Sequence, residues 1–173
     1  FALPYMETLK KWREYLIRYG ADPGEQLCTD DFAGHLSHNT NLSVKAIMGI
    51  KGYAQIAALA GEKDESKKYH KIAVDMASDW EKRAKADDHY QLVFGEGKKD
   101  TWSLKYNLIW DKLWKSGLFS DEVYEKELAY YVSGNVLKPV NCDYVFSELV
   151  NPIFIQDGEQ IKASISVKYL DQR

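Results

Sequence analysis

The chain has 173 residues, of which 45% are apolar and 13% aromatic, enough to fill the core of one domain. Its acidic and basic residues are mixed and leave a formal net charge of −3, so no basic block could follow a phosphate backbone and no nucleic-acid partner is expected. No apolar run approaches the ~18 residues that a membrane-spanning helix requires.

The start of the chain predicts a piece of a longer protein. Phe1 stands where an initiator Met would, and the first residues lack the basic start and apolar centre of a signal peptide. We therefore expect a fragment whose targeting segment and upstream domains are absent.

The first two predicted helices differ in how much of their surface is apolar. Residues 5–19 place apolar side chains at three- and four-residue steps, which predicts an amphipathic helix ended by Gly20. After a polar connector, residues 42–61 are apolar or small on almost every face. A helix of that kind is a buried one.

Three more helices are predicted downstream. Residues 64–86 form an amphipathic surface helix, and residues 90–94 alternate as a short strand or extended loop. Residues 102–117 predict a second, mostly buried helix, and residues 121–134 a further amphipathic one. The five predicted helices thus alternate between exposed and buried, beginning with an exposed one. This alternation fits the concentric layers of an α/α toroid of helical hairpins better than it fits a four-helix bundle.

The tail of the chain has a different pattern. In residues 135–173, apolar side chains from Ile161 to Val167 alternate with polar ones, and Asp157-Gly158 is a turn signal, which predicts a β-hairpin. We therefore expect a mainly α chain: a partial toroid over residues 1–134 and an atypical tail over residues 135–173 that ends in a short hairpin.

The chain has two cysteines, and the sequence does not show whether they form a disulfide. Cys28 and Cys142 could form a disulfide only if the fold brings their Cα atoms within ~7 Å, which the sequence does not decide.

The connector, residues 26–43, gathers polar side chains just before the buried helix. In a toroid, such connectors reach the rim of the central cavity. A desolvated Asp30 or Asp31 could act as general acid or base. The alternative is that one of them caps a turn and the other is solvated.

Histidines and asparagines follow in the same connector. His35 and His38 could both face a metal on a helix, but Gly34 between the acids and histidines argues for a loop, and we expect no metal and no other cofactor. Asn39 and Asn41 could bind a substrate amide or carboxylate. For Asn41 we favour the role of helix N-cap, whereas for His38 and Asn39 the substrate-binding and structural roles both stay open.

A second polar group lies in residues 101–112. Lys105 either points into the cavity as an anion clamp or oxyanion stabiliser, or extends its ammonium to solvent along its methylene stem. Asp111 is expected to be surface charge on the exposed edge of its helix.

Three blocks of the chain resemble a known family. Residues 15–57, 88–114 and 118–131 are similar, in this order, to the six-helical-hairpin domain of the glutaminase A family, large extracytoplasmic proteins of fungi and of gut-type Bacteroides bacteria. The resemblance implies an α/α toroid, an extracytoplasmic location, and hydrolysis of L-glutamine to L-glutamate and ammonia.

The resemblance also points to candidate site residues, because the family's characteristic strings fall on residues 27–32, 38–42, 101–103 and 105–107. The candidate catalytic residues are Asp30, Asp31 and His38, and the candidate substrate-binding residues are Asn39, Asn41, Trp102, Lys105 and Asn107. The expected partners are glutamine or a related amide and the upstream domains of the same parent chain.

Two rival functions remain at this point. Toroids often act on sugars through two carboxylates that face each other across the cavity. The available carboxylates are Asp30, Asp31, Asp87, Asp88 and Asp111. The second rival is a non-catalytic structural or binding fragment whose aromatic residues only fill a core.

Overall fold

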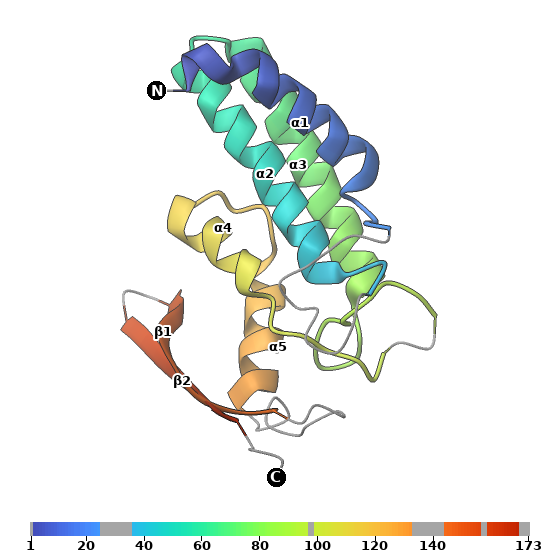
Figure 1. Cartoon of the computed structure of the whole chain (residues 1–173), viewed down its shortest axis with the longest axis vertical. Coiled ribbons are helices and arrows are strands. Elements are labelled where there is room, and N and C mark those ends of the chain that lie inside the picture. Colours follow the sequence, from blue (N-terminus) through green and yellow to red (C-terminus); the bar gives the residue numbers. More distant parts are fainter. Residues whose placement is uncertain (1, 25–35, 97–98, 133–143, 157–158, 170–173) are drawn as a thin grey trace.

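The computed structural model describes residues 2–24, 36–96, 99–132, 144–156 and 159–169. In chain order, the elements are η1 (Leu3–Tyr5), α1 (Met6–Tyr19), α2 (Thr40–Leu59), α3 (Lys63–Ala84), η3 (Tyr106–Leu108), α4 (Ile109–Trp114), α5 (Asp121–Val132), β1 (Tyr144–Gln156) and β2 (Glu159–Tyr169) (Figure 1). The described part is therefore mainly helical.

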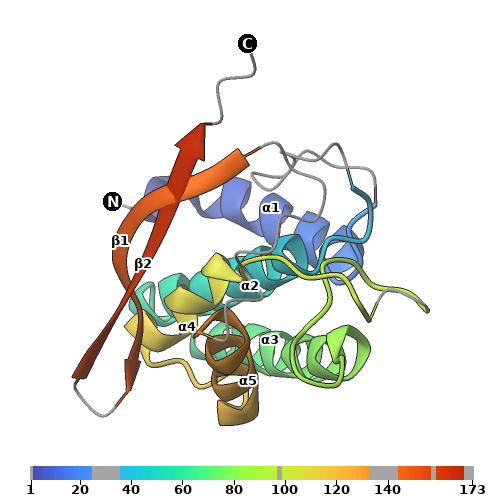
Figure 2. The same cartoon turned by 90° about the horizontal axis from the view of Figure 1, so that it is seen from below.

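Helix α2 is the central element of the helical part. It packs against α1, α3 and η3, and Figure 2 shows it between α1 and α3. Val44, Ile47 and Ile50 are fully buried in its first half, and Ala54 and Ala57 are buried in its second half. The predicted buried helix is confirmed, and its neighbours α1 and α3 are the amphipathic surface helices that the sequence predicts.

Helix α3 turns one apolar stripe toward this core. Its buried residues recur at three- and four-residue steps from Tyr69 to Ala84, as an amphipathic helix requires. Trp80 stacks on Tyr90 at 5.1 Å between ring centroids and meets the edge of Phe119 at 5.5 Å. These ring contacts fix the segments that follow α3 onto the helical core.

A polar cluster joins the middle of α1 to the second half of α2 and the start of α3. The Arg13 guanidinium of α1 lies over the rings of Tyr53 and Tyr69, at 4.6 and 4.1 Å, and is ion-paired with Glu65 of α3. It also donates to the Tyr53 hydroxyl at 2.6 Å. Burial and a hydrogen bond to Glu65 raise the pKa of Tyr53 to about 12.

The predicted buried helix over residues 102–117 is wrong in both extent and burial. Only η3 and α4 are helical there, because Lys105 adopts a non-helical conformation before η3 and Lys115 is left-handed, with φ 51°, after α4. Trp110 and Trp114 are 44% and 40% exposed, since α4 borders an open groove of the described structure.

The two strands at the end of the chain pair in antiparallel fashion, with Leu149 opposite Ile165. The predicted turn at residues 157–158 lies outside the described residues. Among the helices that the structure describes, none has the length and apolarity needed to cross a membrane.

Candidate active site

The described part of the connector begins at residue 36. Asp30, Asp31, His35 and Cys28 lie outside the described residues, as does Cys142 in the tail. The catalytic roles predicted for the two aspartates therefore stay predictions, and the geometry of the site is built from His38 onward.

His38 occupies a strained backbone conformation immediately before α2. Its φ of 63° lies in the left-handed region, which is uncommon for a residue with a Cβ atom. Its N–H donates to the carbonyl of Pro23 at 2.6 Å, and its carbonyl accepts from the N–H of Phe94 at 2.9 Å. Two separate segments thus hold the backbone of this residue.

The His38 imidazole contacts a carboxylate that the sequence analysis did not single out. Nδ1 of His38 lies 2.7 Å from Oδ1 of Asp22, and the other oxygen of Asp22 is ion-paired with Arg83 of α3. The His38 side chain is 54% exposed, so solvent reaches the ring. The sequence pattern could not link Asp22 to His38, because Asp22 stands sixteen residues earlier, in the turn that follows α1.

Asn39 is the N-cap of α2, and this corrects the expectation that Asn41 has that role. Its Oδ1 accepts from the N–H of Leu42 at 2.8 Å, as N-cap side chains do. The side chain is almost fully buried, and its Nδ2 has no hydrogen-bond acceptor among the described residues. Since the cap assigns the oxygen, the unpartnered atom is an amide donor.

Asn41 and Asn107 are joined to each other. Both are buried, and the Asn107 amide nitrogen donates to the carbonyl and to Oδ1 of Asn41, each at 3.2 Å. The backbone N–H of Asn107 also donates to Oδ1 of Asn41 at 3.3 Å. The structure brings together two of the predicted substrate-binding residues, and they connect α2 to η3.

An extended segment supports the start of α2, in agreement with the loop predicted at residues 90–94. The N–H of Thr40 donates to Leu92 at 3.0 Å, and its hydroxyl donates to the carbonyl of Gln91 at 2.5 Å. The indole of Trp80 donates to the carbonyl of Thr40 at 2.8 Å. The residues that flank Asn39 are therefore held by several elements.

Lys105 is buried rather than extended to solvent. Its ammonium donates to the carbonyls of Tyr90 and Ser103, at 2.7 and 2.8 Å, and lies 3.7 Å from the carboxylate of Glu127. Glu127 accepts in turn from the N–H of Tyr90 at 2.8 Å and from the Tyr131 hydroxyl. These contacts explain the burial of Lys105 without a ligand.

Trp102 and Asp111, which the sequence analysis also discussed, have contacts with residues other than His38. Trp102 is half-buried beside Tyr130 and Tyr131. Asp111 is buried, not the surface charge that we expected, because it accepts from the N–H of Leu118 at 3.0 Å and from the Tyr124 hydroxyl at 2.6 Å. Burial and this bond to Asp111 raise the pKa of Tyr124.

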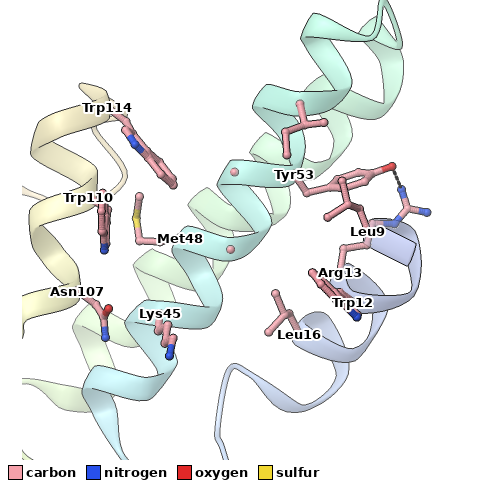
Figure 3. Close-up of a pocket in the computed structure, with 13 residues that line it drawn as sticks. Leu9, Trp12, Arg13, Leu16, Lys45, Met48, Tyr53, Asn107, Trp110 and Trp114 are labelled. Atoms are coloured by element: carbon pink, nitrogen blue, oxygen red, sulfur yellow. Dashed lines mark hydrogen bonds between the residues drawn. The ribbon is translucent and has the colours of Figure 1, made fainter. Parts of the chain in front are cut away.

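An open groove of about 340 Å³ lies over α2, between α1 and α4 (Figure 3). Gly49 and Gly52 lie along α2 at its base, and Trp12, Trp110 and Trp114 are among the residues of its sides. Among the candidate site residues that the structure describes, Asn107 alone lines this groove. The groove is mostly apolar, whereas the polar groups at His38 and Asn39 form a separate site.

Within the described residues, no group of three or more His, Cys, Asp and Glu side chains is arranged to hold a metal ion. The arrangement at the start of α2 instead offers acid–base chemistry: an imidazole hydrogen-bonded to a carboxylate, followed by a buried amide donor. A histidine held in this way can transfer protons, and a preorganised N–H can bind a carbonyl oxygen as it gains negative charge.

Comparison with known proteins places the whole helical part in one family. A model of the glutaminase A six helical-hairpin domain matches residues 1–143. Glutaminase A of Aspergillus oryzae is 35% identical over 127 residues, which are 71% of this chain and 18% of that protein. A protein of Arthroderma benhamiae named Probable glutaminase is 31% identical over 104 residues, 60% of this chain and 12% of the relative.

The chain thus matches less than a fifth of the length of these two relatives. No solved structure matches the chain. The family match covers most of the sequence and includes all eight candidate residues. The chain belongs to the glutaminase A six helical-hairpin family.

Proposed function

We propose that this chain forms a partial α/α toroid and carries the active site of an amidohydrolase. The proposed enzyme converts L-glutamine and water to L-glutamate and ammonia. Family membership and the names of the two relatives support glutamine as the substrate. The resemblance also supports an extracytoplasmic location and further domains in the full-length protein.

The observation that carries the proposal is the pair of functional groups on consecutive residues at the start of α2. His38 presents an exposed imidazole held by Asp22, and Asn39 presents a buried amide donor without an acceptor. Amide hydrolysis needs a base for water and a donor for the developing oxyanion. His38 is placed to act as the base, and the amide of Asn39 acts as the donor once substrate entry uncovers it.

In the proposed reaction, His38 takes a proton from water as the oxygen of that water forms a bond to the carbon of the glutamine amide. The carbonyl oxygen gains negative charge and accepts a hydrogen bond from Nδ2 of Asn39. The C–N bond then breaks, and the proton held by His38 passes to the departing nitrogen, which leaves as ammonia. Asp30 and Asp31 remain candidates for a second proton-transfer group.

Ammonia release from L-glutamine by the full-length protein tests the proposal. His38→Gln is expected to lower kcat by about 10²- to 10⁴-fold, the usual contribution of an acid–base group. The matched control is His70→Gln, because His70 is an exposed histidine of α3 whose Nδ1 accepts from Lys51 at 3.0 Å. Wild-type protein that releases no ammonia, or equal rates for both variants, would overturn the proposal.

A further inference from the structure

The carboxylate of Asp22 lies between two side chains that it contacts through different oxygens. Oδ1 is 2.7 Å from Nδ1 of His38, and Oδ2 is ion-paired with Nη2 of Arg83. Asp22 comes from the turn after α1, His38 from the connector and Arg83 from the last turn of α3. The three residues form a continuous polar chain across separate parts of the fold.

Arg83 is itself fixed by several neighbours. Its other terminal nitrogen donates to Oδ2 of Asp79 at 3.2 Å and to the carbonyl of Ala21 at 3.4 Å. Its guanidinium lies over the Phe94 ring, 4.1 Å from the centroid. Contacts to a turn, a ring and a carboxylate on its own helix restrict where the guanidinium can hold Asp22.

The backbone of His38 is fixed from the same two directions. Pro23, next to Asp22, accepts its N–H, and Phe94, beneath Arg83, donates to its carbonyl. The left-handed conformation is unfavourable for a residue with a Cβ atom, so it persists here because the surroundings impose it. The imposed φ of 63° sets the direction in which the imidazole leaves the chain.

We infer that Asp22, held by Arg83, is a positioning residue that keeps His38 in the Nδ1–H tautomer, with Nε2 left to accept a proton. A carboxylate only accepts hydrogen bonds, so a neutral imidazole facing it must carry its proton on Nδ1. The importance of this tautomer for catalysis rests on the proposed function of His38 as a base. The tautomer itself does not depend on that proposal.

A surface ion pair is the alternative role for these residues. In that case His38 would be a doubly protonated imidazolium, and neither nitrogen could accept a proton from water. Exposed pairs of this kind contribute little to stability, so the contact would have neither a catalytic nor a large structural effect. The protonation state of the ring therefore separates the two roles.

The test is nuclear magnetic resonance of the full-length protein labelled with ¹⁵N and ¹³C at histidine, at neutral to mildly alkaline pH. The His38 signal is assigned by its loss in His38→Gln. Wild-type protein is expected to show Nδ1–H, and Asp22→Ala and Arg83→Gln to shift the population toward Nε2–H. The matched control Asp79→Asn removes the other carboxylate on Arg83 and is expected to keep Nδ1–H.

Glutaminase kinetics complete the experiment. Asp22→Ala is expected to lower kcat roughly 10²-fold with KM near that of the wild type, because the base is misaligned while substrate contacts persist. Asp22→Asn, which retains an oxygen acceptor, provides a second variant if the alanine variant does not fold. Circular dichroism of each variant checks the fold.

The outcomes distinguish the two proposals. An Nε2–H or doubly protonated His38 in active wild-type protein overturns the positioning role and leaves the glutaminase proposal standing. The expected tautomers in a protein that releases no ammonia support the positioning role and overturn the glutaminase proposal. An Asp22→Ala variant with wild-type tautomer and kcat overturns the inference directly.

Discussion

Asn41 and Asn107 form a buried pair of amides that connects the first turn of α2 to the 3-10 turn η3. Sixty-six residues separate them in the chain, so the pair ties the first half of the fold to the second. Two polar side chains without access to water are stabilising only while each keeps its partners.

Removal of one amide of this pair is predicted to destabilise the protein. Asn107→Ala and Asn41→Ala are each expected to lower the free energy of unfolding by about 1–3 kcal/mol, because the remaining buried amide loses the hydrogen bonds that it makes within the pair. The double variant is expected to lose less than the sum, by about 0.5 kcal/mol or more. Urea unfolding measures all three, and an Asn107→Ala variant of full stability with a raised KM would indicate a substrate contact instead.

Substitutions of Asn39 are predicted to separate its two roles. Asn39→Ser keeps a capping oxygen, whereas Asn39→Ala loses it and is expected to cost about 1 kcal/mol of stability. Both variants lack the amide donor, so both are expected to lower kcat by about 10²-fold. Thermal unfolding and ammonia release are the measurements. A serine variant with wild-type kcat would contradict the oxyanion role.

The buried charges of Lys105 and Glu127 are predicted to stabilise the fold only together, because each neutralises the other. Lys105→Met leaves Glu127 buried opposite no cation, which is expected to cost about 3–5 kcal/mol. Lys105→Met combined with Glu127→Gln is expected to be more stable than the single variant. As a control, Lys71→Met removes an exposed pair with Asp75 and is expected to change stability by less than about 1 kcal/mol. Equal losses for the single and double variants would show that the charges do not interact.

Acid is predicted to weaken the Arg13 cluster through Glu65. Burial alone would raise the pKa of Glu65, but hydrogen bonds from Arg13 and Tyr53 outweigh it and lower the pKa below 4.5 in the folded state. The unfolded chain therefore takes up the proton at higher pH than the folded one. The stabilisation is present above about pH 4.5 and is lost as the pH falls through the folded-state pKa.

Glu65→Gln tests this dependence by unfolding measured at neutral and acidic pH. The variant is expected to be less stable at neutral pH and to lose less stability on acidification than the wild type. Glu62→Gln is the matched control, since the Glu62 side chain makes no capping hydrogen bond at the start of α3. Parallel pH profiles for wild type and Glu65→Gln would contradict the prediction.

The helical core was predictable because its pattern is local. A run of small and apolar residues without a polar face identifies α2 as buried, and spaced apolar residues identify α1 and α3 as surface helices. The same reasoning failed for α4. The apolar pattern of Trp110 and Trp114 is the same whether a partner covers them or not, so hydropathy could not reveal that they border an open groove.

The site was predictable in part. The polar connector pointed to His38 and Asn39. The cap at Asn39 is defined by its hydrogen bond with the N–H of Leu42, and periodicity does not resolve an N-cap to within two residues. Asp22 and Arg83 could not be found, because α1, the connector and α3 must pack before these residues meet. Contacts of this kind belong to tertiary structure.

The groove over α2 gives the protein a built-in optical signal. Trp12, Trp110 and Trp114 are exposed along it, at 63%, 44% and 40%, whereas Trp80 is 1% exposed in the core. Indole emission moves to shorter wavelength when water is removed from the ring, so anything that covers the groove shifts the fluorescence to the blue and protects it from iodide quenching. Trp80 is already shielded from water, so its contribution to the emission is expected to stay unchanged.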